Sequence, residues 1–253
     1  MQICKLCNLP FPELENSHII SECFYKYLYD KKHRYVPISN EVDEQLEMKQ
    51  KGFTEKLLCK ACENKFSKWE NILSKDFEDI GKMSSSYLTI STVKADWIKV
   101  EGIRFNEFKR GLLSIFWRAS ISSLKVFRNY KFGPYNERIR EILFNDKPLS
   151  AIQYPILMKM GTLEGNYAEG VMMFYPRGKF NIHSSVYRMT ISGFDFTLYM
   201  TEDKFPSQAE KILIGGYSSL YFMKFRIEDV LSGGGVLDRF GDDDVIKIMS
   251  RLK

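Results

Sequence analysis

Four cysteines in two Cys-x-x-Cys pairs predict a metal site. Two residues separate Cys4 from Cys7, and two residues separate Cys59 from Cys62. A Cys-x-x-Cys turn lets both sulfur atoms reach one ion, and two such turns complete a tetrahedral site with Zn–S bonds of about 2.3 Å. We therefore expect a structural Zn²⁺, which in a small folding unit would supply much of the folding energy.

A histidine lies between the two pairs, in the motif Ser17-His18-Ile19-Ile20. A neutral imidazole near pH 7 can take a proton from water, so His18 is a candidate general base. The alternative is that His18 donates a hydrogen bond inside the zinc unit or binds the zinc itself. His33 lies in a charged run and His183 in a predicted loop, so a Ser-His or Cys-His hydrolase has little support.

The elements around these residues form a first unit over residues 1–82. Residues 17–29 predict a short strand or turn that leads into a helix, and the polar residues 30–51 predict a loop or insertion. Apolar residues then recur every three or four positions from Cys62 to Leu73, which predicts a helix that begins at the second cysteine pair.

The remaining residues, 83–253, predict a larger unit that begins with a β-prone segment at 87–93 and continues with helices over about 104–145. The periodicity favours one long helix over 106–130 and another over 135–144. Alternating segments between glycines predict an antiparallel sheet over about 154–228. Its expected strands are 156–160, 171–175, 186–191, 195–200, 211–214 and 220–225. A glycine turn and a last helix from Asp242 complete an α+β fold.

The charge distribution offers a candidate surface for nucleic acid. The chain of 253 residues has a net charge of +5, which by itself does not indicate nucleic acid, but basic residues gather between positions 104 and 140. The alternative is an ordinary solvated helix face. The residues that we expect to contact phosphate are Arg104, Lys109, Arg110, Arg118, Lys125 and Arg128.

The cysteine usage and hydropathy favour a cytoplasmic protein. No apolar stretch has the length that a membrane span needs, and no cleavable apolar segment precedes Cys4. Free thiolates for a metal are typical of a reducing compartment. The fifth cysteine, Cys23, is expected to be a small buried apolar residue.

Taken together, these motifs resemble the HNH endonuclease superfamily in its zinc-bound ββα-metal form. The matching residues are Cys4 and Cys7, the Ser17-His18-Ile19-Ile20-Ser21 motif, and the Leu58-Cys59-Lys60-Ala61-Cys62-Glu63 motif. The similarity is greatest to a bacterial group with Ser-His-Ile-Ile-x-Glu and Leu-Leu-Cys-x-x-Cys-Glu motifs. It covers about the first 75 residues and, more loosely, the helix around Arg118.

The resemblance implies a metal-dependent endonuclease that acts on DNA in bacterial anti-phage defence. His18 would be the general base, and Glu63, with Glu22 or Asn64, would bind a catalytic Mg²⁺ or Mn²⁺. Three positions depart from the family pattern: Ser17 replaces an acidic ligand, Glu63 replaces a histidine, and Thr54 and Glu55 occupy the asparagine region.

Because of these departures, the alternative is a zinc-stabilised subunit with a decayed nuclease site that docks a protein or nucleic-acid partner. Such a subunit would work within a defence complex or as a homo-oligomer. A zinc-ribbon transcription factor is less attractive, because most of the chain lies outside the zinc unit and lacks an obvious recognition helix.

Overall fold

The computed structural model describes residues 1–35, 49–94, 96–181, 184–201, 207–215, 218–227 and 229. At the N-terminus, two small antiparallel ribbons precede a long helix. The elements are β1 (Gln2–Ile3) paired with β2 (Pro10–Phe11), β3 (Glu15–His18) paired with β4 (Thr54–Leu58), the 3-10 helix η1 (Glu22–Tyr25), and helix α1 (Lys60–Gly81). The predicted helix after the second cysteine pair is therefore confirmed, and it continues beyond Leu73.

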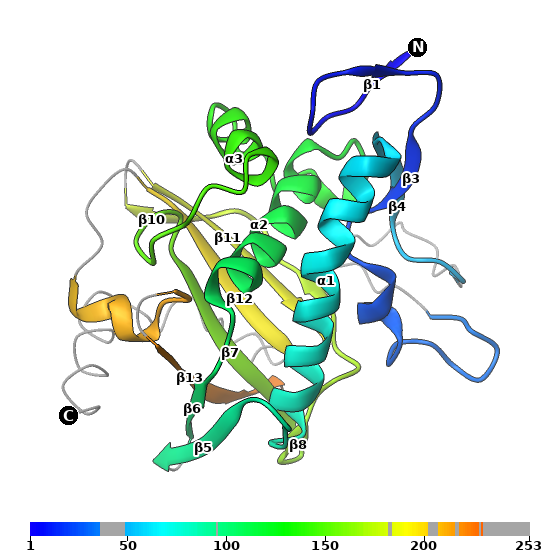
Figure 1. The fold of residues 1–253 in the computed structure, drawn as a ribbon. Coiled ribbons are helices and arrows are strands. Elements are labelled where there is room, and N and C mark those ends of the chain that lie inside the picture. The colour runs from blue at the N-terminus through cyan, green and yellow to red at the C-terminus, as the bar shows by residue number, and fades with distance from the viewer. Residues whose placement is uncertain are drawn as a thin grey trace.

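A mixed sheet forms the centre of the molecule (Figure 1). Its strands are β5 (Thr89–Lys94), β6 (Trp97–Glu101), β7 (Ile156–Leu163), β8 (Asn166–Tyr167), β9 (Met173–Phe174), β10 (Gly178–Asn181), β11 (Ser184–Ile191), β12 (Phe194–Met200) and β13 (Ser219–Arg226). The main order is β10-β11-β12-β7-β13-β6-β5, with β8 beside β7 and β9 beside β11. The predicted sheet is thus largely antiparallel, except that β13 runs parallel to β7.

One predicted strand is wrong. Residues 211–214 were expected to be extended, but Lys211 and Ile212 end a 3-10 helix, η3 (Ser207–Ile212). The amide of Leu213 donates to the carbonyl of Glu210 at 3.2 Å, and this turn leaves a single bridge between Leu213 and Leu157.

The other helices are α2 (Phe105–Ile121), the 3-10 helix η2 (Lys125–Phe127) and α3 (Tyr135–Phe144). The prediction for α3 is confirmed. The predicted helix over 106–130 is wrong in length, because Ser122 leaves the helical conformation and, with Ser123, binds the carboxylate of Glu55 from β4. The ammonium group of Lys131 donates hydrogen bonds to the carbonyls of Ser120 and Ser122 at the end of the helix.

Helices α1 and α2 lie side by side over one face of the sheet (Figure 1). Phe77 of α1 packs on Phe194 and Phe196 of β12, with ring centroids 5.0 and 5.3 Å apart, and on Phe108 of α2 at 5.8 Å. One cluster of buried apolar side chains extends from Cys4 to Phe222. It contains residues from both sides of residue 82, where the sequence predicts the unit boundary.

Several expectations lie outside the described residues, namely the glycine turn, the helix from Asp242 and the loop that holds His183. Within the described ranges, none of the helices combines the length and apolar character that crossing a membrane requires.

Candidate metal centre and histidine site

The first cysteine pair lies in a tight turn between β1 and β2. The amide of Asn8 donates to the carbonyl of Cys4 at 2.9 Å, and the amide of Cys4 donates to the carbonyl of Leu9 at 3.0 Å. Asn8 has a φ of 58°, a left-handed conformation that asparagine tolerates better than most residues. This turn directs both thiols to the same side of the chain.

The second pair lies where β4 ends and α1 begins. Cys59 is the residue before the first turn of the helix, and Cys62 belongs to that turn. The amide of Lys5 donates to the carbonyl of Leu57 at 2.9 Å, and this bond joins the two turns. A second bond joins the amide of Cys59 to the sulfur of Cys4 at 3.3 Å.

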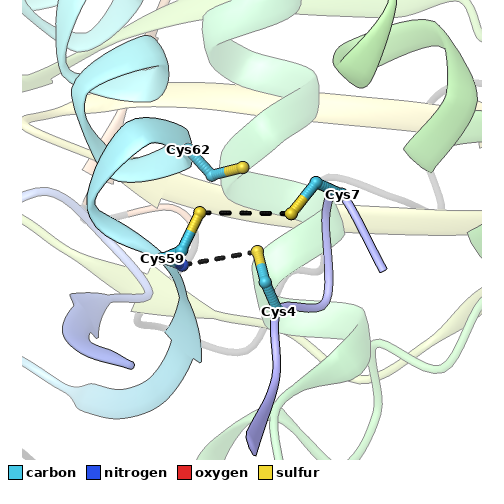
Figure 2. Close-up of side chains that lie close together, drawn as sticks. All are labelled: Cys4, Cys7, Cys59 and Cys62. Carbon is cyan, nitrogen blue, oxygen red and sulfur yellow. Dashed lines mark hydrogen bonds between the residues drawn. The ribbon is translucent and has the colours of Figure 1, made fainter. Parts of the chain in front are cut away.

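The four sulfur atoms converge on one point, as Figure 2 shows, and all lie within 4.8 Å of one another. The Sγ atoms of Cys7 and Cys59 are 4.0 Å apart, close to the S···S separation of about 3.8 Å that a tetrahedron with Zn–S bonds of 2.3 Å requires. Cys4, Cys59 and Cys62 are buried, and Cys7 is partly exposed. Four soft donors with tetrahedral spacing fit Zn²⁺ well.

Without a metal, the thiols share one negative charge unequally. The hydrogen bond from the Cys62 thiol and then backbone amides, including that of Cys59, lower the pKa of the Cys4 thiol well below its ordinary value, whereas the same hydrogen bond and burial raise the pKa of Cys62, and burial raises the pKa of Cys7. Arg140 of α3 also donates to the carbonyl of Leu6 at 2.6 Å, which brings a guanidinium close to the first turn. That guanidinium also forms an ion pair with the carboxylate of Glu137, so its positive charge is largely neutralised.

His18 lies at the end of β3, and its ring contacts a carboxylate. Its Nε2 atom is 3.1 Å from Oε2 of Glu22, and the two side chains are 34% and 40% exposed. Its backbone carbonyl accepts a bond of 2.6 Å from the guanidinium of Arg118. The structure therefore brings His18 and Glu22 together in a position that solvent can reach.

Sequence reasoning did not identify two aromatic residues that belong to this site. The hydroxyl of Tyr29 donates to Oε1 of Glu22, and His33 lies 3.8 Å from the same oxygen. The rings of Tyr29 and His33 stack with centroids 3.7 Å apart. The sequence separates these residues from His18 by a turn of irregular pattern, so no local periodicity could have grouped them.

The remaining predicted cation ligands lie apart from this pair. A group of three or more Cys, His, Asp or Glu side chains can share an ion where their ligand atoms lie close together. In the described part of the chain, only the four cysteines meet this condition. Thus His18, Glu22 and Glu63 do not fit a ready-made cation site. Glu63 has a buried Oε1 atom without a hydrogen-bond partner, and Asn64 is exposed on α1.

Ser17 has a structural role. It is fully buried, and its hydroxyl accepts the amide of Leu58 from β4 at 3.2 Å. Because neighbouring residues of a strand point to opposite faces, the side chain of Ser17 points away from that of His18. The hydroxyl thus stabilises the β3–β4 ribbon.

The structure corrects two members of the predicted phosphate-binding set. Lys109 and Arg118 are fully buried. Lys109 donates to the carbonyls of Ser150 and Ala151 at 2.7 and 2.9 Å, and Arg118 pairs with Glu70. Neither side chain is therefore available to an external phosphate.

The other four predicted phosphate contacts remain accessible to different degrees. Arg104, Lys125 and Arg128 are exposed, whereas Arg110 is partly buried and donates to the carbonyls of Asp146 and Lys147. They lie on separate elements, at the start of α2, within α2 and around η2. The accessible basic residues therefore do not form the single basic helix surface that the sequence predicts.

Comparisons of the chain with protein-family models, with curated proteins and with solved structures found no match.

Proposed function

We propose that this chain is a zinc-stabilised, HNH-like endonuclease that acts on DNA, with His18 as the general base. The observation that carries this proposal is the pair of His18 and Glu22 at the end of a strand, 3.1 Å apart and open to solvent. This strand belongs to a β3–β4–α1 unit that has one cysteine pair in the β1–β2 turn before β3 and the other where β4 meets α1. The element order agrees with the ββα-metal form that the motifs resemble.

The geometry suits proton abstraction. If the Nε2–H group of His18 donates to Glu22, the Nδ1 atom keeps its lone pair and can accept a proton from water. The carboxylate of Glu22 then stabilises the imidazolium that forms, and it also fixes the ring orientation. The activated water attacks the phosphorus atom of a phosphodiester and the P–O bond to the leaving oxygen breaks. The leaving oxygen takes a proton from solvent water, and the imidazolium of His18 returns its proton to solvent.

Zinc would have a structural role in this scheme, because all four donors at its site come from the protein. A catalytic Mg²⁺ or Mn²⁺ has less support, since His18, Glu22 and Glu63 do not surround one point. We therefore assign no step to such an ion. The plasmid-cleavage assay measures separately whether cleavage depends on added Mg²⁺ or Mn²⁺.

A plasmid-cleavage assay with and without Mg²⁺ or Mn²⁺ tests this proposal. We expect His18→Ala to lower the cleavage rate by at least about a hundredfold, the usual effect of losing a general base. Glu22→Gln is expected to lower the rate less, and Glu63→Ala should reveal whether Glu63 contributes. Zinc content and circular dichroism are the folding controls. Wild-type cleavage by a folded His18→Ala protein would refute the assignment.

A second candidate function is a zinc-stabilised docking subunit without nuclease activity. The specific observations in its favour are the structural role of Ser17 and the burial of Lys109 and Arg118. For this function, we expect no cleavage with either cation and stable co-purification of a defined partner. Cleavage that depends on His18 would exclude it.

A further inference from the structure

A short turn beside His18 carries exposed lysines, and Glu22 holds this turn in place. The Glu22 carboxylate faces His18 through Oε2, and its other oxygen accepts the hydroxyl of Tyr29. His33 lies 3.8 Å from Oε1 of Glu22 and stacks on the ring of Tyr29. The turn over residues 29–34 is therefore fixed to the same carboxylate as the candidate base.

The turn has a defined internal structure. The carboxylate of Asp30 accepts the amides of Lys32 and Arg34 at 2.8 and 2.9 Å. It also binds the guanidinium of Arg34 through two hydrogen bonds. His33 has a φ of 57°, which reverses the chain at this point. These bonds give the backbone a fixed shape despite its exposure.

The same bonds leave an excess of positive charge on the turn. Asp30 is neutralised by Arg34, whereas Lys31 and Lys32 are exposed and pair with no carboxylate of the residues that the structure places. On the other side of Glu22, the amide of Gly52 lies 3.4 Å from Oε2, and the preceding residue, Lys51, is also exposed. Lysines thus lie on two of the chain segments that contact Glu22, the turn over 29–34 and the segment at Gly52.

We propose that Lys31, Lys32 and Lys51 form a phosphate-contacting surface, hereafter the lysine surface, that holds the DNA backbone beside His18. This inference rests on the proposed function and changes the expected location of the DNA contacts. Lysines bind phosphate as point charges and release counterions from the duplex. Contacts on the two sides of Glu22 would place a phosphodiester near the partly exposed ring of His18.

The test measures binding to a short DNA duplex by fluorescence anisotropy without divalent cations, at several salt concentrations. We expect the Lys31→Gln/Lys32→Gln/Lys51→Gln protein to bind about tenfold more weakly or worse near 0.1 M salt. The slope of log K against log salt should become shallower by about 2 to 3, since each lost phosphate contact removes about 0.9. The matched control is Lys68→Gln/Lys179→Gln/Lys211→Gln, which removes the same charge at exposed positions elsewhere.

Three outcomes would overturn the lysine surface: no DNA binding by the wild-type protein, unchanged binding by the first variant, or an equal loss in the control. Zinc content and circular dichroism verify that both variants fold. Binding through the lysine surface without cleavage would refute the nuclease and keep this inference. Cleavage that depends on His18 but not on the three lysines would refute the lysine surface and keep the nuclease.

Discussion

At the scale of single residues, the buried guanidinium of Arg118 connects the candidate site to the core. It pairs with Glu70 of α1, donates to the carbonyl of His18 and lies 5.4 Å from the ring centre of Phe66. Both charged side chains are almost completely buried. A buried pair of this kind contributes less through net attraction than through the cost of leaving one partner alone.

We therefore predict that Arg118→Met destabilises the protein by about 3–5 kcal/mol, because it leaves the Glu70 carboxylate buried without its partner. The double variant Arg118→Met/Glu70→Leu should recover most of this loss, since it removes both charges. Urea unfolding of the two variants and the wild type gives the comparison. Equal destabilisation by the single and double variants would mean that the lost packing of Arg118 dominates.

Lys109 provides a pH-dependent prediction. Burial lowers the pKa of Lys109 to about 7, whereas an unfolded lysine titrates near 10.4. Between these values the unfolded chain binds more protons than the folded one, so stability rises with pH in this window and falls as pH drops toward 7. Relative to Lys109→Met, the wild-type protein should gain about 2 kcal/mol between pH 6.5 and 9.

Urea unfolding at both pH values measures the Lys109 effect, because taking the difference from Lys109→Met cancels the other titrating groups. An exposed-site variant, Lys68→Met, serves as the control and should show a constant difference from the wild type. A constant difference for Lys109→Met as well would show that Lys109 keeps its charge in the folded protein.

At the scale of elements, α1 and α2 approach closely at Gly111. A methyl group at this position would lie 2.6 Å from Cδ1 of Leu73, a fully buried side chain of α1. Alanine favours a helix over glycine by about 1 kcal/mol, but overpacking a core costs about 1–3 kcal/mol. We predict that Gly111→Ala is destabilising in thermal or urea unfolding. A more stable variant would show that Leu73 can move aside.

The elements also show which parts of the fold the sequence could predict. The helix α3 and most strands follow from local periodicity, because their buried faces repeat along the chain. The end of α2 could not be predicted this way, since it depends on Glu55, 67 residues away from Ser122. The strand β6 (Trp97–Glu101) was missed, although its buried Ile98 and Val100 alternate with Lys99 and Glu101 in the pattern of a strand.

In the candidate site too, features set by neighbouring residues could be predicted from the sequence, whereas contacts between residues far apart in the chain could not. The Cys-x-x-Cys spacing places two donors in each turn, so the cluster was predictable from residue type and spacing. His18 and Glu22 are four residues apart and were both candidates, but only the structure pairs them. The burial of Lys109 depends on carbonyls more than 40 residues away, which charge counting along the sequence does not detect.

At the scale of the whole molecule, the zinc-type centre is joined to the central sheet through α1. The helix begins at the cysteine cluster, and its Phe77 packs on Phe194 and Phe196 of β12. Buried apolar side chains continue through this contact without a gap. Loss of the metal should therefore weaken the whole core as well as the first 82 residues.

We predict that removing zinc with a chelator, or the substitution Cys59→Ser, lowers the Tm of the whole chain by roughly 10 °C or more in a single transition. Differential scanning calorimetry with zinc analysis measures this, and the wild-type protein should hold one zinc per chain. Cys23→Ser is the matched control, because Cys23 lies outside the four-thiol cluster and its loss should leave the zinc content unchanged. Two transitions, of which only one responds to zinc, would instead support the independent units that the sequence predicts. A single zinc-dependent transition would mean that the metal stabilises the sheet through α1, whose Phe77 packs on β12.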